Sequence, residues 1–391
     1  MKVEIRFFIF LALTSIMAIC TPEGGKDRVT SDVHLDYAAI ADEIMARCEL
    51  QSGEQVLLVG QPGRFDPLIP LLKKGIENAG AVYLGTSSVD SSLQFDSWST
   101  EFTRSVSAMS DIELPLFLSA VQLGIMLPGA TPTNRVYAGL QKVLSDGSGR
   151  TIHFHWEGAY HLDGSPIVVD SAIDIFYQNA LLKTDYAALA SKQVEFENAM
   201  RNNWVHVTTP AGTDIKFQIG DRQVTKQDGN ASRAHMNEAK TLIDREVELP
   251  PGAIRVAPIE ETVDGVIVFP DSDWLGKRVI KPTMKFEKGK VIKVSADENA
   301  ALVQQEIDQA GEAGRSFREF ALGFNPMLAI PSEDLWIPYY GYGAGVVRLS
   351  LGDNSELGGK ITGGYVRWNF FTDATVTVGD EIWIDAGKLI K

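Results

Sequence analysis

The sequence predicts a two-domain protein in which an α/β domain with a parallel sheet precedes a mainly β, α+β domain. Three observations predict this fold class: a strand–helix–strand order near the N-terminus, short alternating strands after residue 203, and a length of 391 residues, which suffices for two hydrophobic cores. We assign a processing segment to 1–20, a polar tether to 21–35, the α/β domain to 36–203 and the mainly β domain to 204–391.

The first twenty residues have the pattern of an export signal. A short charged start precedes an almost wholly apolar stretch over residues 7–19, and Cys20 follows it directly. Such a stretch is too short to cross a bilayer but suits the core of a secretory signal. The cysteine indicates a bacterial lipoprotein signal with Cys20 as the lipidated residue, although ordinary cleavage and an uncleaved anchor are alternatives. We therefore expect an exported cell-envelope protein attached to the membrane through Cys20.

The α/β domain is predicted from alternating apolar segments. Apolar residues at helical spacing begin at Tyr37, and Cys48 is interpreted as a buried helix residue without a disulfide partner. A strand, a helix and a second strand then follow in the order of a parallel βαβ unit. The predicted segments are a strand at 55–60, a helix at 66–78, a strand at 81–84, a helix running into a strand over 114–126, and a helix at 184–200.

The texture changes at Trp204, where short alternating strands separated by turns begin. The turn at 210–214 contains Gly and Asp, which favour a structural turn between two strands. The predicted segments are strands at 205–209, 215–219 and 266–269, a hairpin of 284–286 with 291–294, and an amphipathic helix at 299–313.

Composition limits the partners. A net charge of −15 and the lack of a dense Lys/Arg stripe argue against nucleic-acid binding. Hydrophobic content of 45% and charged content of 22% are ordinary for a globular protein.

The histidines supply one candidate metal cluster. His153, His155 and Glu157 share one face if this segment is a strand, and two imidazoles with a carboxylate can bind zinc. His161 lies just beyond. The interpretation we favour is a polar or dimer-facing strand, because short H-x-H runs are common by chance. No histidine follows His235.

Four segments of the C-terminal half resemble the thermophilic metallo-aminopeptidase family, whose namesake is aminopeptidase T, and are also similar to its 2,5-dihydroxypyridine dioxygenase relatives. The resemblance covers most of residues 204–385. It implies a C-terminal domain of aminopeptidase-T type, a homodimer, two divalent metal ions such as zinc or cobalt, and release of N-terminal amino acids from peptides. The segments are TTPAGTDIKF (208–217), LPPGAIRVAP with VDGVI (249–267), REFALGFNP (318–326), and GVVRLSLGDN with YVRWN (345–369).

The resemblance also places the family's metal ligands on this chain, and four of the five positions have changed. Glu319 keeps its carboxylate, whereas a glutamate is replaced by Ala253, two histidines by Arg348 and Arg367, and an aspartate by Asn369. Arginine cannot lose its proton in a protein, so it cannot ligate a cation. We therefore predict no catalytic residues and no bound metal.

Two uses of the altered site are open. Glu319 can pair with Arg348 or Arg367 in an ion-pair network that fills the former metal cavity. Alternatively, Arg348 and Arg367 bind the carboxylate or phosphate of a small anion. Aromatic residues near these positions either line a ligand cleft or pack the domain: Trp336, Tyr339, Tyr340, Tyr342 and Trp368.

The function predicted from the sequence is that of an exported, non-catalytic homologue of metallo-aminopeptidases, a pseudoenzyme that binds a peptide or a small anion. One alternative is an active metal-dependent aminopeptidase that uses other ligands. Another is a structural or partner-binding lipoprotein of the envelope.

Overall fold

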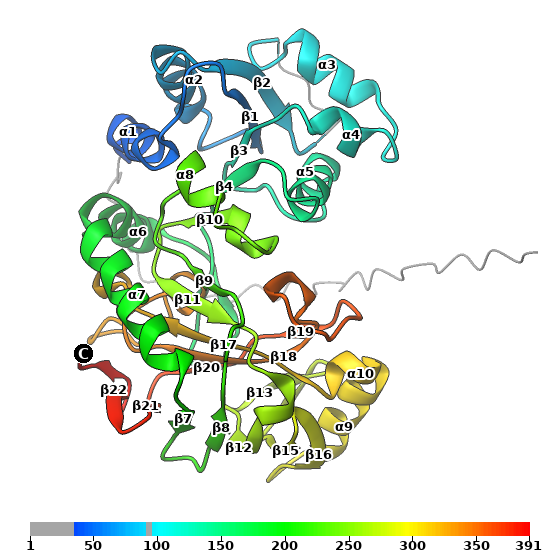
Figure 1. Ribbon diagram of the computed structural model, residues 1–391, viewed down its shortest axis with the longest axis vertical. Helices are drawn as coiled ribbons and strands as arrows, with labels where there is room; N and C mark the ends of the chain where they lie inside the picture. The colour runs from blue at the N-terminus through cyan, green and yellow to red at the C-terminus, as the bar shows by residue number, and fades with distance from the viewer. Residues whose placement is uncertain (1–34, 91–95) are drawn as a thin grey trace, which may run out of the picture.

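The computed structural model describes residues 35–90 and 96–391. The predicted signal (1–20), its Cys20 and all of the tether except Leu35 lie outside the described residues. A parallel sheet with its helices forms one end of the molecule, and two antiparallel sheets form the other (Figure 1). The predicted fold class is thus confirmed. None of the described helices has the length and apolar character that a membrane span requires.

The parallel sheet contains five strands among the described residues, in the order β10-β4-β3-β1-β2. Side chains alternate along its strand at 55–60, so that Val56 and Leu58 pack in one core while Leu57 and Val59 pack in another. Both faces are therefore covered by helices, as expected for a parallel sheet. The strands are β1 (Gln55–Gly60), β2 (Val82–Ser88), β3 (Leu123–Met126), β4 (Arg150–Phe154) and β10 (Glu246–Leu249).

Helices cover the two faces in two groups. One group shares a hydrophobic core with Val56 and Leu58, and the other shares a core with Leu57 and Val59. Cys48 is fully buried in the first core, as predicted, and burial raises the pKa of its thiol to about 12. The first group is α1 (Tyr37–Cys48), α2 (Leu68–Asn78) and α6 (Ser171–Lys183), and the second is α3 (Glu101–Ala108), α4 (Leu114–Leu118) and α5 (Arg135–Ser145).

Strand β10 comes from the part of the sequence that we assign to the C-terminal domain. It lies beside β4 (Figure 1) and pairs with it in parallel. In this pairing, Glu248 stands opposite His153. A boundary at residue 203 therefore does not separate the parallel sheet from the antiparallel sheets, because β10 follows that boundary. This return of the chain brings acidic residues of the C-terminal half beside the histidines of the N-terminal half.

The antiparallel sheets pack against each other. Alternate residues of the smaller sheet, among them Val256, Phe320 and Leu349, share a core with Val207 and Phe217 of the larger sheet. The opposite face of the smaller sheet is turned toward the parallel-sheet end and is polar. The smaller sheet consists of β9 (Val224–Lys226), β11 (Ala253–Val256), β17 (Phe317–Gly323), β18 (Val347–Gly352), β19 (Val366–Arg367) and β20 (Phe370–Phe371).

The larger antiparallel sheet contains the predicted hairpin. A long helix, α7 (Tyr186–Arg201), precedes it, and the predicted helix at 299–313 is divided at Gly311, which has a φ of 64°. The strands are β7 (Val205–Thr208), β8 (Asp214–Phe217), β12 (Asp264–Val268), β15 (Thr283–Glu287), β16 (Lys290–Ser295), β21 (Thr375–Val378), β22 (Glu381–Asp385) and β23 (Lys388–Leu389); the divided helix is α9 (Ala300–Gln309) and α10 (Gly311–Gly314).

Candidate functional site

A pocket lies between the parallel sheet and the polar face of the smaller antiparallel sheet. One wall contains Arg255 and Arg348, and the other contains His153, His155 and Glu248. The two walls differ in the side chains that they present, so each is described in turn. Their remaining polar and aromatic lining is supplied by Thr131, Tyr137, Gln141, Glu157, Glu246, Tyr340, Tyr342, Glu356 and Trp368.

The strand register explains why charges gather on the first wall. Arg255 and Arg348 both lie opposite Ala321, on β11 and β18 respectively, and Glu319 is two residues from Ala321 on β17. Side chains two residues apart on a strand point to the same face. The two arginines therefore converge on Glu319 from both neighbouring strands.

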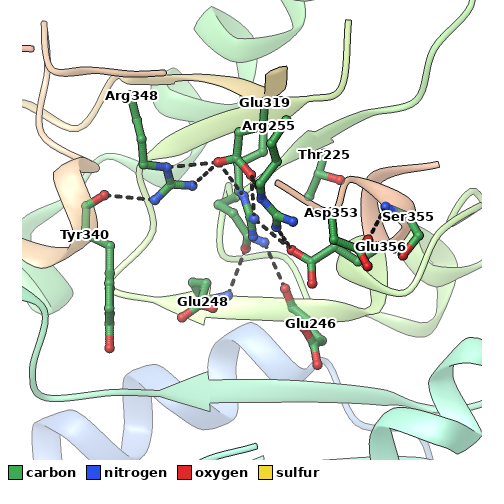
Figure 2. Close-up of polar contacts among 12 residues, drawn as sticks. Thr225, Glu246, Glu248, Arg255, Glu319, Tyr340, Arg348, Asp353, Ser355 and Glu356 are labelled. Atoms are coloured by element: carbon green, nitrogen blue, oxygen red, sulfur yellow. Dashed lines mark hydrogen bonds and ion pairs between the residues drawn. The ribbon is translucent and has the colours of Figure 1, made fainter. Parts of the chain in front are cut away.

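Glu319 is fully buried, and guanidinium groups occupy both of its carboxylate oxygens. Arg348 Nε and Nη2 donate to Oε1 at 2.9 and 2.5 Å, and Arg255 Nη2 donates to Oε2 at 2.9 Å (Figure 2). Burial alone would raise the pKa of this carboxyl, but the arginines hold it well below its usual range. Glu319 is thus a charged ion-pair partner.

A third arginine completes the network. The strand is irregular between Phe317 and Glu319, and this bulge lets Arg318 donate from Nε to Glu319 Oε2 at 3.3 Å. Glu356 accepts hydrogen bonds from both Arg255 and Arg318. Three guanidinium groups and two carboxylates give the network a formal charge of +1.

Arg367 lies elsewhere, so the prediction that it shares the site with Arg348 is wrong. It pairs with Leu351 in the sheet, and Leu351 belongs to the core on the opposite face. Its guanidinium donates to Glu306 at 3.0 Å and lies 3.5 Å from the centre of the Trp274 ring. The alternation of side chains along the strand is the reason.

The other two former ligand positions contribute no charge. Ala253 is buried in the hydrophobic core beside the pocket, and the Asn369 amide donates to the Leu349 carbonyl at 3.3 Å.

The aromatic residues named from the sequence have two different roles. Tyr340, Tyr342 and Trp368 line the pocket, whereas Trp336 and Tyr339 pack against Tyr177.

The second wall arises from the pairing of β4 with β10. Glu248 stands opposite His153, and His155 follows two residues later along the chain. One ligand atom from each of His153, His155 and Glu248 lies within 4.8 Å of the others. Glu248 therefore takes the place that the sequence suggests for Glu157, which is exposed and accepts a hydrogen bond from Tyr340. His161 is exposed and outside the cluster.

Burial and neighbouring charges shift the pKa values of the histidines and carboxyl groups on this wall. Burial would raise the pKa of Glu248, but the His155 and His153 rings lower it overall. Burial also lowers the pKa of His155, which favours the neutral imidazole. Glu246 differs, because its burial keeps the pKa of its carboxyl raised. The pKa of His153 is raised in spite of its burial, because Glu246 and Glu248 favour its charged form. A carboxylate and a neutral imidazole are the forms that bind metal ions, so an ion binding here would displace the His153 proton.

Comparisons with known proteins cover three of the four segments identified in the sequence, and the fourth, at 345–369, lies outside the family match. The model of a thermophilic metalloprotease (M29) family matches residues 184–330. The solved structure of a 2,5-dihydroxypyridine dioxygenase from Pseudomonas putida KT2440 superposes with a TM-score of 0.59 at 14% identity, covering 91% of this chain and 98% of that one. Residues 184–330 are therefore similar to a metalloprotease family, and the fold is that of the dioxygenase. Wild-type AmpT from Thermus thermophilus has the same fold, with a TM-score of 0.54 at 14% identity over 90% of this chain and 99% of AmpT. No curated protein matches the chain.

The resemblance to the thermophilic metallo-aminopeptidase family implies a two-metal centre, and the Glu319 wall does not fit one. Both Glu319 oxygens accept charge-assisted hydrogen bonds, and a divalent ion would have to displace Arg255 and Arg348 from them. The predicted absence of any metal needs correction, however. The histidine wall has a possible metal site, and the similarity of residues 184–330 to a metalloprotease family also argues against a protein without metal.

The sequence reasoning missed Arg255, Arg318, Glu248 and Glu356. Strand alternation could have identified Arg255, because it lies two residues after position 253 on one strand. Glu248 offers no such signal. It meets His153 only because a segment about a hundred residues away joins the same sheet.

Proposed function

We propose that this metallo-aminopeptidase-like protein is a binding protein that does not hydrolyse peptides. The single observation that carries this proposal is the burial of Glu319 among three guanidinium groups. In the related family, this position is implied to hold a divalent ion. Here, the positive charge is supplied by Arg255, Arg318 and Arg348, which are part of the chain.

The electrostatic cost of reversing this arrangement supports the proposal. Removing one partner from a buried ion pair typically costs about 3–5 kcal/mol. A divalent ion arriving at Glu319 would break two such pairs and would face cations already in place. Metal binding there is therefore opposed by the folded structure as well as by the missing histidines.

The charges and rings of the pocket favour a short peptide over a small anion as ligand. Arg348 is engaged by Glu319 and by the Tyr340 carbonyl, and Arg367 lies on another face. The opposite wall presents carboxylates, which suit an amino-terminal ammonium group, with the Tyr340 and Trp368 rings close by. A peptide terminus combines that cation with an apolar side chain.

The cellular setting is proposed from the sequence. The apolar segment at 7–19 and Cys20 support export and lipid anchoring in the bacterial envelope. We expect Cys20→Ala to move the protein from the membrane fraction to the soluble fraction. Full solubility of the unaltered protein would contradict the anchor. The homodimer implied by the family belongs to the same proposal and is tested by mass measurement in solution.

Hydrolysis assays test the central proposal. The full chain, free of any purification tag, should release no product from leucine anilide or other aminoacyl anilides with added cobalt, zinc or manganese. Hydrolysis that needs metal and stops with a chelator would contradict it. Native mass spectrometry of the purified protein should instead detect a bound peptide.

The histidine wall favours a second candidate, a metal-dependent hydrolase that uses ligands other than the family's. His153, His155 and Glu248 supply the type of ligand set found in catalytic zinc sites. This candidate predicts metal-dependent hydrolysis that is lost in His155→Ala and retained in Arg348→Lys. The first proposal predicts none in either.

A further inference from the structure

We propose that His153, His155 and Glu248 bind one divalent transition-metal ion of the zinc class, on the pocket wall opposite Glu319. Two imidazoles and one carboxylate form a ligand set that zinc and its neighbours prefer. The site differs from the family's two-metal centre in residues and in position. It does not depend on whether the protein hydrolyses anything.

The ligand atoms are spaced almost closely enough to share one ion. Glu248 Oε1 lies 3.6 Å from His153 Nδ1, and Glu248 Oε2 lies 3.9 Å from His155 Nε2. These separations exceed the roughly 3.2 Å limit of a good hydrogen bond. They are close to the spacing of about 3.3 Å that two ligands take on a tetrahedral ion with bonds of about 2.0 Å. Small side-chain movements would close the set around an ion.

His155 provides an independent second observation. Its side chain is 10% exposed and borders the pocket, yet neither ring nitrogen has a hydrogen-bond partner among residues 35–90 and 96–391. Carboxylate oxygens of Glu157 and Glu248 lie 3.9 Å from its Nδ1 and Nε2 respectively. Because no protein group holds the two ring nitrogens and the ring borders the pocket, an ion in the pocket can reach them.

One outer residue already orients the His153 ring. Thr151 Oγ1 lies 3.0 Å from His153 Nε2, at hydrogen-bond distance. Glu246 Oε1 lies 3.8 Å from the same nitrogen, beyond hydrogen-bond distance, and accepts a hydrogen bond of 2.8 Å from Gln141. A hydrogen bond behind a ligand histidine fixes the orientation of its ring. His153 Nδ1 then faces the ion.

The remaining neighbours of the ligand atoms define what an ion must displace. The Tyr137 hydroxyl lies 3.0 Å from His153 Nδ1, and an ion at this nitrogen takes its place. The Tyr339 hydroxyl lies 3.3 Å from Glu248 Oε2 and can stay as an outer hydrogen bond. Three protein ligands leave a coordination position open toward the pocket. That position suits a water molecule or the amino group of a bound peptide.

The experiment is a metal titration of the tag-free full chain after treatment with a chelator. Cobalt(II) and zinc(II) are each added, with calorimetry for stoichiometry and the visible spectrum of cobalt for ligand geometry. We expect one equivalent of ion and an absorption typical of low-coordinate cobalt. His155→Ala and Glu248→Gln should each weaken binding at least tenfold.

Matched controls separate this site from others. His161→Ala removes a nearby exposed imidazole, and Glu319→Gln alters the arginine wall; both should still bind one equivalent. Thermal melts of all variants verify folding, and the spectrum of the unaltered chain tests the site without any substitution. Absence of binding by the unaltered chain, or binding that His155→Ala and Glu248→Gln both leave intact, would overturn the proposal.

Discussion

The two walls of the pocket differ in how their buried carboxylates are paired. On one wall, the buried Glu319 is saturated by three cations that belong to the chain. On the other, Glu248 and His155 stand too far apart to hydrogen bond to each other. A buried carboxylate requires a positive charge, and that charge can be built in or bound from solution. On our proposal, a pocket whose Glu319 wall binds no metal still binds an ion on its histidine wall.

The largest expected effect comes from removing the buried carboxylate. Glu319→Ala leaves three guanidinium groups without their shared partner and should lower the free energy of unfolding by about 3–5 kcal/mol. Glu248→Ala should cost clearly less, since its carboxylate has no guanidinium partner at hydrogen-bond distance among the described residues. Urea denaturation of both variants measures the contrast. Equal losses would mean that the two walls do not differ as described.

A double-mutant cycle sharpens the contrast between the two arginines. Arg348→Met with Glu319→Gln should show a coupling of about 1–3 kcal/mol, because these groups are buried and share two hydrogen bonds. The Arg367–Glu306 pair is less buried and should couple by less than about 1 kcal/mol. Stronger coupling of Arg367 than of Arg348 would contradict the assignment of these residues to different faces.

Restoring the family's ligands tests how completely the first wall has changed. Ala253→Glu, Arg348→His, Arg367→His and Asn369→Asp together return the expected residue types. We predict that this variant, combined with His155→Ala, takes up no ion, because Arg255 and Arg318 still bind Glu319 and position 367 faces the other core. Elemental analysis after dialysis measures uptake. Two bound ions would show that the cavity has kept its original form.

The smallest expected effect is a pH dependence. The folded pKa of Glu319 is lowered, so its ion pairs stabilise the protein above the unfolded value of about 4.3 and lose that contribution as pH falls toward the folded value. The stability difference between the unaltered chain and Glu319→Gln should be constant above about pH 5 and shrink in stronger acid. A difference that grows on acidification would reverse the sign and contradict the charged state of Glu319.

Local pattern was sufficient for the fold class, and the family resemblance supplied one half of the site. The strand predicted at 55–60 and the helix predicted at 184–200 correspond to β1 and α7, and the replacement at Arg348 correctly indicates an ion pair with Glu319. The rest depends on sheet pairing that local pattern does not encode. Arg367 pairs with Leu351 of β18, and this pairing places its side chain on the face of the sheet opposite Arg348 and Glu319. Glu248 meets His153 through a pairing between distant strands.

The most direct test of the account is a crystal structure of the protein soaked in zinc, with diffraction data collected on both sides of the zinc absorption edge. The account predicts one anomalous peak within bonding distance of His153, His155 and Glu248, and Glu319 bound to its arginines. A peak at Glu319, with Arg255 and Arg348 displaced, would contradict it.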